Sequence, residues 1–300
     1  TQSLFVGDLQ GNFYAVSPQT QNALWRLQTT ETFVHAGVAD ANQVYVSTQQ
    51  GNILAIDART GKQNWSTTLS GRILATPARS NDTLLTSTTD KRVVALQASN
   101  GDTRWTFRTQ GQVLLTPYIT AQSIYVADDE GVIYALTPDK GTLQWRKQLQ
   151  ASFASGIALS GQTLFLADQK GKLFAVNITN QTLAWEVQLQ GKVTATPQIA
   201  NGILNLGTWA KQLYAIKIED GQLLWQKTLE GILSASPFLY QQDLYIGGWD
   251  GQITRIRASS GEILQRFNTE DRLTTPPWRL EDRLYFACQD GTLYGVDLPR

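Results

Sequence analysis

Ala55-Ile56-Asp57-Ala58-Arg59-Thr60-Gly61-Lys62-Gln63-Asn64-Trp65 is one copy of a segment that the chain repeats every 40 residues. Tryptophan returns at this interval without a slip, at Trp25, Trp65, Trp105, Trp145, Trp185 and Trp225. Each has an alanine ten residues before it, at Ala15, Ala55, Ala95, Ala135, Ala175 and Ala215. The seventh equivalent site holds Gln265, and there Arg255 replaces the alanine. A fixed period of this length indicates an array of equivalent supersecondary units.

Residues 71–108 show what one unit builds. Short runs rich in Val, Leu, Thr and aromatic residues predict four strands, at Ile73–Ala78, Thr83–Thr88, Arg92–Gln97 and Arg104–Phe107. Asn100-Gly101, and Asp-Gly at 250–251 and 290–291, supply the positive φ values that tight hairpins need. No window keeps a 3.6-residue period over the length of a helix, so no helix is predicted. Four strands in each 40-residue unit are typical of a propeller blade.

The number of runs favours eight blades. Eight second-strand runs begin near Leu4, Val44, Leu84, Ile124, Leu164, Leu204, Leu244 and Leu284, and eight third-strand runs follow them. There are only seven innermost runs, beginning near Phe33, and seven outer runs, ending with Gln265. A seven-bladed ring would have to discard one good pair of strands. We therefore expect a single all-β domain over residues 1–300, an eight-bladed β-propeller of four-stranded antiparallel blades with incomplete first and last blades.

Eight such units would need about 320 residues, whereas the chain has 300. The difference corresponds to one outer strand and the next innermost strand, which predicts a weak seam between the first and last blades. The Leu4–Gly7 run would then present an unpaired edge, to which a partner or a second copy could donate a strand. The alternatives are that residues 1–3 and water satisfy this edge, or that the ring tightens.

The eleven residues from Ala55 to Trp65 closely resemble the tryptophan-docking motif of the pyrroloquinoline-quinone (PQQ) repeat family of β-propellers. Three further copies keep the Ala, Gly and Trp, namely Ala95–Trp105, Ala135–Trp145 and Ala215–Trp225. Gln21 and Gln181 replace the Gly in two others. The family includes quinoprotein alcohol dehydrogenases, the outer-membrane assembly lipoprotein BamB and sensor domains attached to bacterial kinases. The resemblance implies the fold and favours a periplasmic or extracytoplasmic location, but it is poorly specific for function.

The quinoprotein enzymes of this family stack the quinone between a Trp and a disulfide of adjacent cysteines, beside a calcium held by Glu, Asn and Asp. This sequence has one cysteine, Cys288, and a constant register that leaves no room for functional insertions. Cys288 is expected to be a small buried side chain, and the single histidine, His35, to be structural. We therefore predict no catalytic residue, no cofactor and no metal site.

Acidic residues recur in the hairpins between second and third strands, at Asp90, Glu130, Asp250 and Asp290. Turn chemistry explains them better than a calcium site, because dispersed residues do not converge on one cation. Net charge is zero and charged residues make up 17% of the chain, which argues against nucleic acid as a partner. No apolar run is long enough to span a membrane.

Three tryptophans outside the docking set suggest a binding surface. Trp209 and Trp249 occupy the same hairpin position in consecutive repeats, and Trp278 follows Pro277 at the edge of an innermost run. Tryptophan is enriched at binding hot spots, although packing under a neighbouring loop would also explain these three residues. The leading prediction is a non-catalytic scaffold that binds a protein or peptide on one propeller face. The alternatives are a PQQ-dependent oxidoreductase and an engineered repeat protein without a biological ligand, which the absence of Met would suit.

Overall fold

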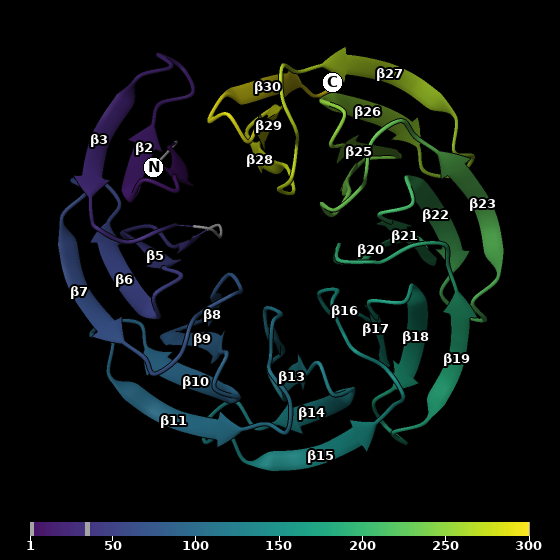
Figure 1. Cartoon of the computed structure of the whole chain (residues 1–300), viewed down its shortest axis with the longest axis horizontal. Coiled ribbons are helices and arrows are strands. Elements are labelled where there is room, and N and C mark those ends of the chain that lie inside the picture. Colours follow the sequence, from purple (N-terminus) through teal and green to yellow (C-terminus); the bar gives the residue numbers. More distant parts are fainter. Residues whose placement is uncertain (1–2, 34–36, 300) are drawn as a thin grey trace. The chain divides into compact units, whose positions relative to one another are not determined.

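The computed structural model describes residues 3–33 and 37–299. The chain forms two compact units, Thr1–Gln150 and Ala151–Arg300. Each unit consists of four antiparallel sheets, and in each four-stranded sheet the strands lie side by side in chain order. In Figure 1 the last strand of each four-stranded blade follows the outer side of its unit.

The first unit contains a three-stranded and three four-stranded blades. Their strands are β1 (Leu4–Gly7), β2 (Asn12–Val16) and β3 (Ala23–Gln28); β4 (Val38–Ala39), β5 (Gln43–Ser47), β6 (Asn52–Asp57) and β7 (Gln63–Thr68); β8 (Ala78–Ser80), β9 (Thr83–Thr88), β10 (Arg92–Gln97) and β11 (Thr103–Arg108); and β12 (Tyr118–Ile119), β13 (Ile124–Ala127), β14 (Val132–Leu136) and β15 (Leu143–Gln148).

The second unit contains three four-stranded blades and a three-stranded one. Their strands are β16 (Ala158–Ser160), β17 (Thr163–Ala167), β18 (Lys172–Asn177) and β19 (Leu183–Gln188); β20 (Gln198–Ala200), β21 (Ile203–Gly207), β22 (Gln212–Lys217) and β23 (Leu223–Thr228); β24 (Phe238–Tyr240), β25 (Asp243–Gly247), β26 (Gln252–Arg257) and β27 (Ile263–Asn268); and β28 (Trp278–Leu280), β29 (Arg283–Ala287) and β30 (Leu293–Asp297).

These eight sheets confirm the predicted fold class, an all-β eight-bladed propeller with incomplete first and last blades. The described residues contain thirty strands and no helix. The first blade has no innermost strand in the described part of the chain, so β1 pairs only with β2. In the same way, no described residue forms a strand beyond β30 in the last blade.

The predicted innermost strand is wrong in its position. We expected Ile73–Ala78, whereas the ladder with β9 covers Ala78–Ser80 and continues only as an isolated bridge between Ile73 and Thr88. Pro77 has no N–H to donate to a ladder. The Ile73 side chain is fully buried, so the apolar pattern at this point reports core packing and not strand pairing.

Five of the six docking tryptophans join their own blade to the next. Within a blade, Ala55 lies directly opposite Trp65 across the β6–β7 pair, and the other five Ala–Trp pairs repeat this register. Across blades, the Trp65 Nε1–H donates to the carbonyl oxygen of Ala98 at 3.0 Å. The same bond, also 33 residues along the chain, links Trp25 to Ala58, Trp105 to Pro138, Trp185 to Ile218 and Trp225 to Ala258.

The glycine of the motif receives the ring of the preceding blade. A Cβ atom on Gly61 would lie 2.6 Å from Cδ2 of Trp25, and one on Gly141 would lie 2.3 Å from Cε3 of Trp105. These glycines also have positive φ, 73° and 64°. The predicted turn role is therefore confirmed, and close approach of an indole is a second reason for the glycine. Gln21 and Gln181 keep the left-handed conformation, with φ of 59° at each.

The apolar cores lie between neighbouring blades of a unit. Leu85 and Val93 of the third blade, for example, pack in one cluster with Ile124, Val126 and Tyr134 of the fourth. Trp105 belongs to this cluster and is only 8% exposed. A blade therefore buries most of its apolar surface only when its neighbour is present.

The seventh blade has Arg255 and Gln265 in place of the Ala–Trp pair. Arg255 lies opposite Gln265 in the β26–β27 ladder. The Arg255 guanidinium binds Oδ2 of the buried Asp243 through Nε at 2.7 Å and Nη2 at 2.6 Å, and Nη1 of Arg257 lies 2.8 Å from Oδ1 of the same carboxylate. The two residues replaced here, at 255 and 265, are cross-strand partners, as Ala and Trp are in the other six repeats.

Replacing Trp105 by Ala should lower the free energy of unfolding by about 3–5 kcal/mol, because it removes a buried ring from an inter-blade core. Urea unfolding followed by circular dichroism measures this loss. The control is Leu24→Ala on β3, where the side chain is 57% exposed and the change should be within about 0.5 kcal/mol. Similar losses for the two variants would contradict the docking role.

Replacing Gly141 by Ala should destabilise the protein more than Gly161→Ala does. Both glycines have positive φ, 64° and 56°, but a Cβ at 161 would meet nothing within 4 Å. Both variants therefore carry the cost of a positive φ at an alanine. The difference between their free energies of unfolding, about 1–3 kcal/mol, then measures the clash with Trp105. Equal urea midpoints for the two variants would show that the indole adjusts without cost.

Candidate functional site

The hairpins between second and third strands lie beside the connections that enter each blade. In the sixth blade the Trp209 N–H donates to the Lys192 carbonyl oxygen at 2.9 Å, and in the seventh the Trp249 N–H donates to that of Ile232 at 3.1 Å. The Gln289 N–H makes the same bond to Arg272 in the eighth, at 3.0 Å. Both kinds of loop therefore form one rim of the blades, and the connections bring their side chains to the hairpin residues.

Trp209 and Trp249 are in contact on this rim. Their ring centroids are 5.1 Å apart at an interplanar angle of 59°. Both residues are half-buried, so part of each ring stays open to solvent. The fold thus brings together the two hairpin tryptophans that the repeat comparison singled out.

Hydroxyl groups below the rings fix both indoles. The Trp209 Nε1–H donates to Oγ1 of Thr194 at 2.9 Å, and the Trp249 Nε1–H donates to Oγ of Ser234 at 2.7 Å. The Thr194 hydroxyl in turn donates to the Ser234 carbonyl oxygen at 3.3 Å. The equivalent positions are apolar in three blades without a hairpin tryptophan, at Leu74, Leu114 and Ala154, and the eighth blade, with Gln289, has Thr274.

A cation lies against each tryptophan of the pair. Lys192 Nζ is 5.1 Å from the Trp209 ring centroid, and the Arg272 guanidinium carbon is 5.4 Å from that of Trp249. Both distances are within the range of a cation–π interaction. Sequence reasoning missed these cations and the two hydroxyl residues. A comparison of repeats at a fixed offset would have found the hydroxyls, because each precedes its tryptophan by 15 residues.

Trp278 does not join this group. It lies half-buried in β28, opposite Tyr285 of β29. Within the described residues it makes no ring contact with Trp209 or Trp249. Of the three tryptophans named as candidate binding residues, Trp209 and Trp249 are the two in direct contact among the described residues.

The acidic residues of the hairpins serve the turns. Asp290 accepts hydrogen bonds from the Thr292 N–H at 2.8 Å and the Thr292 hydroxyl at 3.0 Å, and Asp250 accepts one from the Gln252 N–H at 3.4 Å. Asp90 pairs with Arg92 at 3.0 Å, and Glu130 pairs with Lys91 of the preceding blade at 3.3 Å. No cluster of three potential metal ligands occurs among the described residues.

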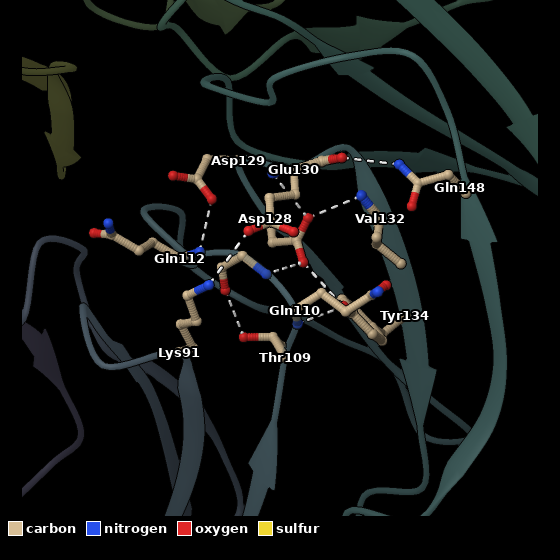
Figure 2. Close-up of polar contacts among 11 residues, drawn as sticks. Lys91, Thr109, Gln110, Gln112, Asp128, Asp129, Glu130, Val132, Tyr134 and Gln148 are labelled. Atoms are coloured by element: carbon tan, nitrogen blue, oxygen red, sulfur yellow. Dashed lines mark hydrogen bonds and ion pairs between the residues drawn. The ribbon is translucent and has the colours of Figure 1, made fainter.

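Figure 2 shows the polar contacts that hold one of these hairpins, around Asp128, in place. Asp128 is fully buried, and its carboxylate accepts hydrogen bonds from the N–H groups of Gly111 and Val132, both at 2.8 Å, and from the Tyr134 hydroxyl at 2.9 Å. The Tyr134 oxygen accepts a further bond from the Gln110 N–H at 2.8 Å. A buried carboxylate with this many donors holds the hairpin against the incoming connection. The role is structural.

Two other sequence predictions concern single residues. His35 lies outside the described residues. Cys288 is a free, buried thiol, as expected, and burial raises the pKa of that thiol above its usual value. Within residues 3–33 and 37–299, no helix has the length and apolarity needed to cross a bilayer.

The comparisons with known proteins agree with the repeat pattern. Residues 2–75, 68–148 and 129–294 match the family described as outer membrane protein assembly factor BamB. None of the curated protein sequences matches the chain.

Three solved structures are similar to it. The crystal structure of BamB from Moraxella catarrhalis covers 99% of this chain and 94% of its own, with a TM-score of 0.87 and 19% identity. The computationally designed protein Ika8 gives 99% and 94% coverage, a TM-score of 0.88 and 16% identity. Quinohemoprotein alcohol dehydrogenase from Comamonas testosteroni gives 100% and 74%, a TM-score of 0.81 and 13% identity. At these identities the likeness shows the fold, and it confirms the resemblance to PQQ-repeat propellers.

The Tyr134 hydroxyl should make stability depend on alkaline pH. Burial raises the pKa of Tyr134 to about 12, and its hydrogen bond to the Asp128 carboxylate acts in the same direction. Between about pH 10 and 12 the unfolded state therefore loses a proton that the folded state keeps, so the free energy of unfolding falls as pH rises. Below about pH 10 this contribution is fully present.

Urea unfolding of the wild type and Tyr134→Phe from about pH 9 to 11.5 isolates this effect, because all other titrating groups are common to both. The stability advantage of the wild type over the variant should shrink as pH rises. A constant difference across the series would mean that Tyr134 ionises as it does in the unfolded chain.

Proposed function

The chain belongs to the family described as outer membrane protein assembly factor BamB, and we propose that it is a non-catalytic scaffold that binds a protein or peptide on one face. The observation that carries the proposal is the Trp209–Trp249 pair, half-buried and in contact on the rim of adjacent blades. Tryptophan contributes large contact area with few rotatable bonds, which is why it is frequent among the residues that dominate binding.

The hydrogen bonds beneath the pair support this role. Each indole N–H is already satisfied by Thr194 or Ser234, so the rings are held in place before a partner arrives. A side chain that is ordered in the free protein loses little conformational entropy when it binds. Trp278 belongs to the proposal as a separate, peripheral contact on the last blade.

The proposed lack of catalysis rests on the sequence. A chain with a single cysteine cannot form the disulfide of adjacent cysteines that the resemblance associates with bound PQQ. The fold that the chain shares with a quinohemoprotein alcohol dehydrogenase keeps PQQ-dependent oxidation as the second candidate. The unpaired edge of β1 adds a finer proposal, the acceptance of a strand from a partner.

Photo-cross-linking tests the proposal on the full chain in the organism from which it comes. A photoreactive amino acid replaces Ala210, which is exposed next to Trp209, or Gln222, which is exposed in the loop between β22 and β23 at the other end of the blade. A defined protein should cross-link from position 210 and not from 222. Cross-linking from neither position, or equally from both, would contradict a binding rim.

Titration with PQQ and Ca²⁺ separates the second candidate. The proposal expects no saturable change in quinone absorbance and no oxidation of alcohols. Stoichiometric PQQ binding with alcohol-dependent dye reduction would replace the scaffold by an oxidoreductase.

A further inference from the structure

The rim around Trp209 carries charges as well as rings. Lys192 lies against the Trp209 ring, the Trp209 ring contacts the Trp249 ring, and Arg272 lies against the Trp249 ring. These four residues are called the rim ladder. Its two cations lie at the ends and its two indoles in the middle, and three consecutive blades contribute to it.

The two cations of the rim ladder have no counter-ion among the described residues. Eleven ion pairs link other charged side chains, but neither Lys192 nor Arg272 forms one with any described residue. By contrast, Arg266 on the outer strand of the seventh blade pairs with Glu230 at 3.4 Å. The attraction of each ladder cation to a ring orients it and leaves its positive charge unneutralised.

We propose that the rim ladder binds an acidic peptide segment in which an apolar or aromatic residue is flanked on both sides by Asp or Glu. This inference rests on the proposed scaffold function and names the chemistry of its partner. The apolar residue packs on the Trp209–Trp249 pair, and the flanking carboxylates pair with Lys192 and Arg272. Charge complementarity of this kind sets partner choice and association rate, while the rings supply the buried area.

A peptide fits the rim ladder better than nucleic acid does. Stacking aromatics and cations also bind single strands, but such sites track the phosphate backbone along a positively charged groove. Here Asp250 follows Trp249, Asp271 precedes Arg272 and Glu230 lies in the connection that enters the seventh blade, so acidic residues interrupt the positive charge of the rim. Two cations separated by two rings match two separated carboxylates and not a continuous polyanion.

A random dodecapeptide phage library panned against the intact protein tests the specificity. Enriched sequences should carry acidic residues on both sides of an apolar or aromatic residue. A fluorescein-labelled peptide of the enriched sequence should bind about tenfold more weakly to Lys192→Gln, Arg272→Gln and Trp249→Ala. Lys170→Gln, an exposed cation on the equivalent hairpin of the fifth blade, removes the same charge as a control and should change the affinity less than about twofold.

Conservative variants and competitors complete the test. Lys192→Arg and Arg272→Lys should retain binding, and an unchanged near-ultraviolet circular dichroism spectrum shows that each variant keeps its tryptophan packing. No acidic enrichment, or affinity that is indifferent to Lys192→Gln and Arg272→Gln, overturns the proposal. Competition by oligothymidylate or benzene-1,3,5-tricarboxylate at the peptide's own affinity also overturns it, in favour of a general anion site.

Cross-linking from position 210 distinguishes failure of the acidic-peptide proposal from failure of the scaffold function. A partner that still cross-links in the Lys192→Gln/Arg272→Gln variant leaves the binding rim in place and removes the acidic peptide. Absence of any cross-linked protein in the wild type removes the scaffold function itself.

Discussion

The contact between a tryptophan of one blade and the turn of the next is the interaction on which the other features depend. It combines an Nε1–H bond to a carbonyl 33 residues ahead with close approach of the ring to a glycine 36 residues ahead, as in Trp225, Ala258 and Gly261. Because it is directional as well as apolar, it sets the position of a neighbouring blade and not only its attachment. Trp209 and Trp249 meet on the rim because this contact holds the sixth blade to the seventh.

The second and third strands were predictable to the residue, as with Thr83–Thr88 and Arg92–Gln97. Their alternation and turn residues carry the information locally. The innermost strand was not, since the apolar run from Ile73 serves the core while the ladder begins after Pro77. The second function of Gly61 was also out of reach, because the ring that needs it, Trp25, belongs to another blade.

Some residues of the rim could be predicted by comparing repeats, and others could be found only from the folded structure. Trp209 and Trp249 stand out because six equivalent positions hold other residues, and the comparison correctly pairs them. Lys192 and Arg272 occur in a position that varies freely between repeats, so their contacts with the rings appear only once the connections are folded against the hairpins. Trp278 shows the limit of the method, because a shared residue type does not place it in the same contact.

The charged triplet of the seventh blade, Arg255, Asp243 and Arg257, constrains how this repeat can change. Loss of Arg255 alone would leave the buried Asp243 short of a partner, and loss of Asp243 alone would leave two arginines facing each other. A return to the alanine of the other repeats would therefore pass through a variant with unbalanced charge in this blade, which should be less stable. Substitutions at these three positions are therefore coupled in their effect on stability.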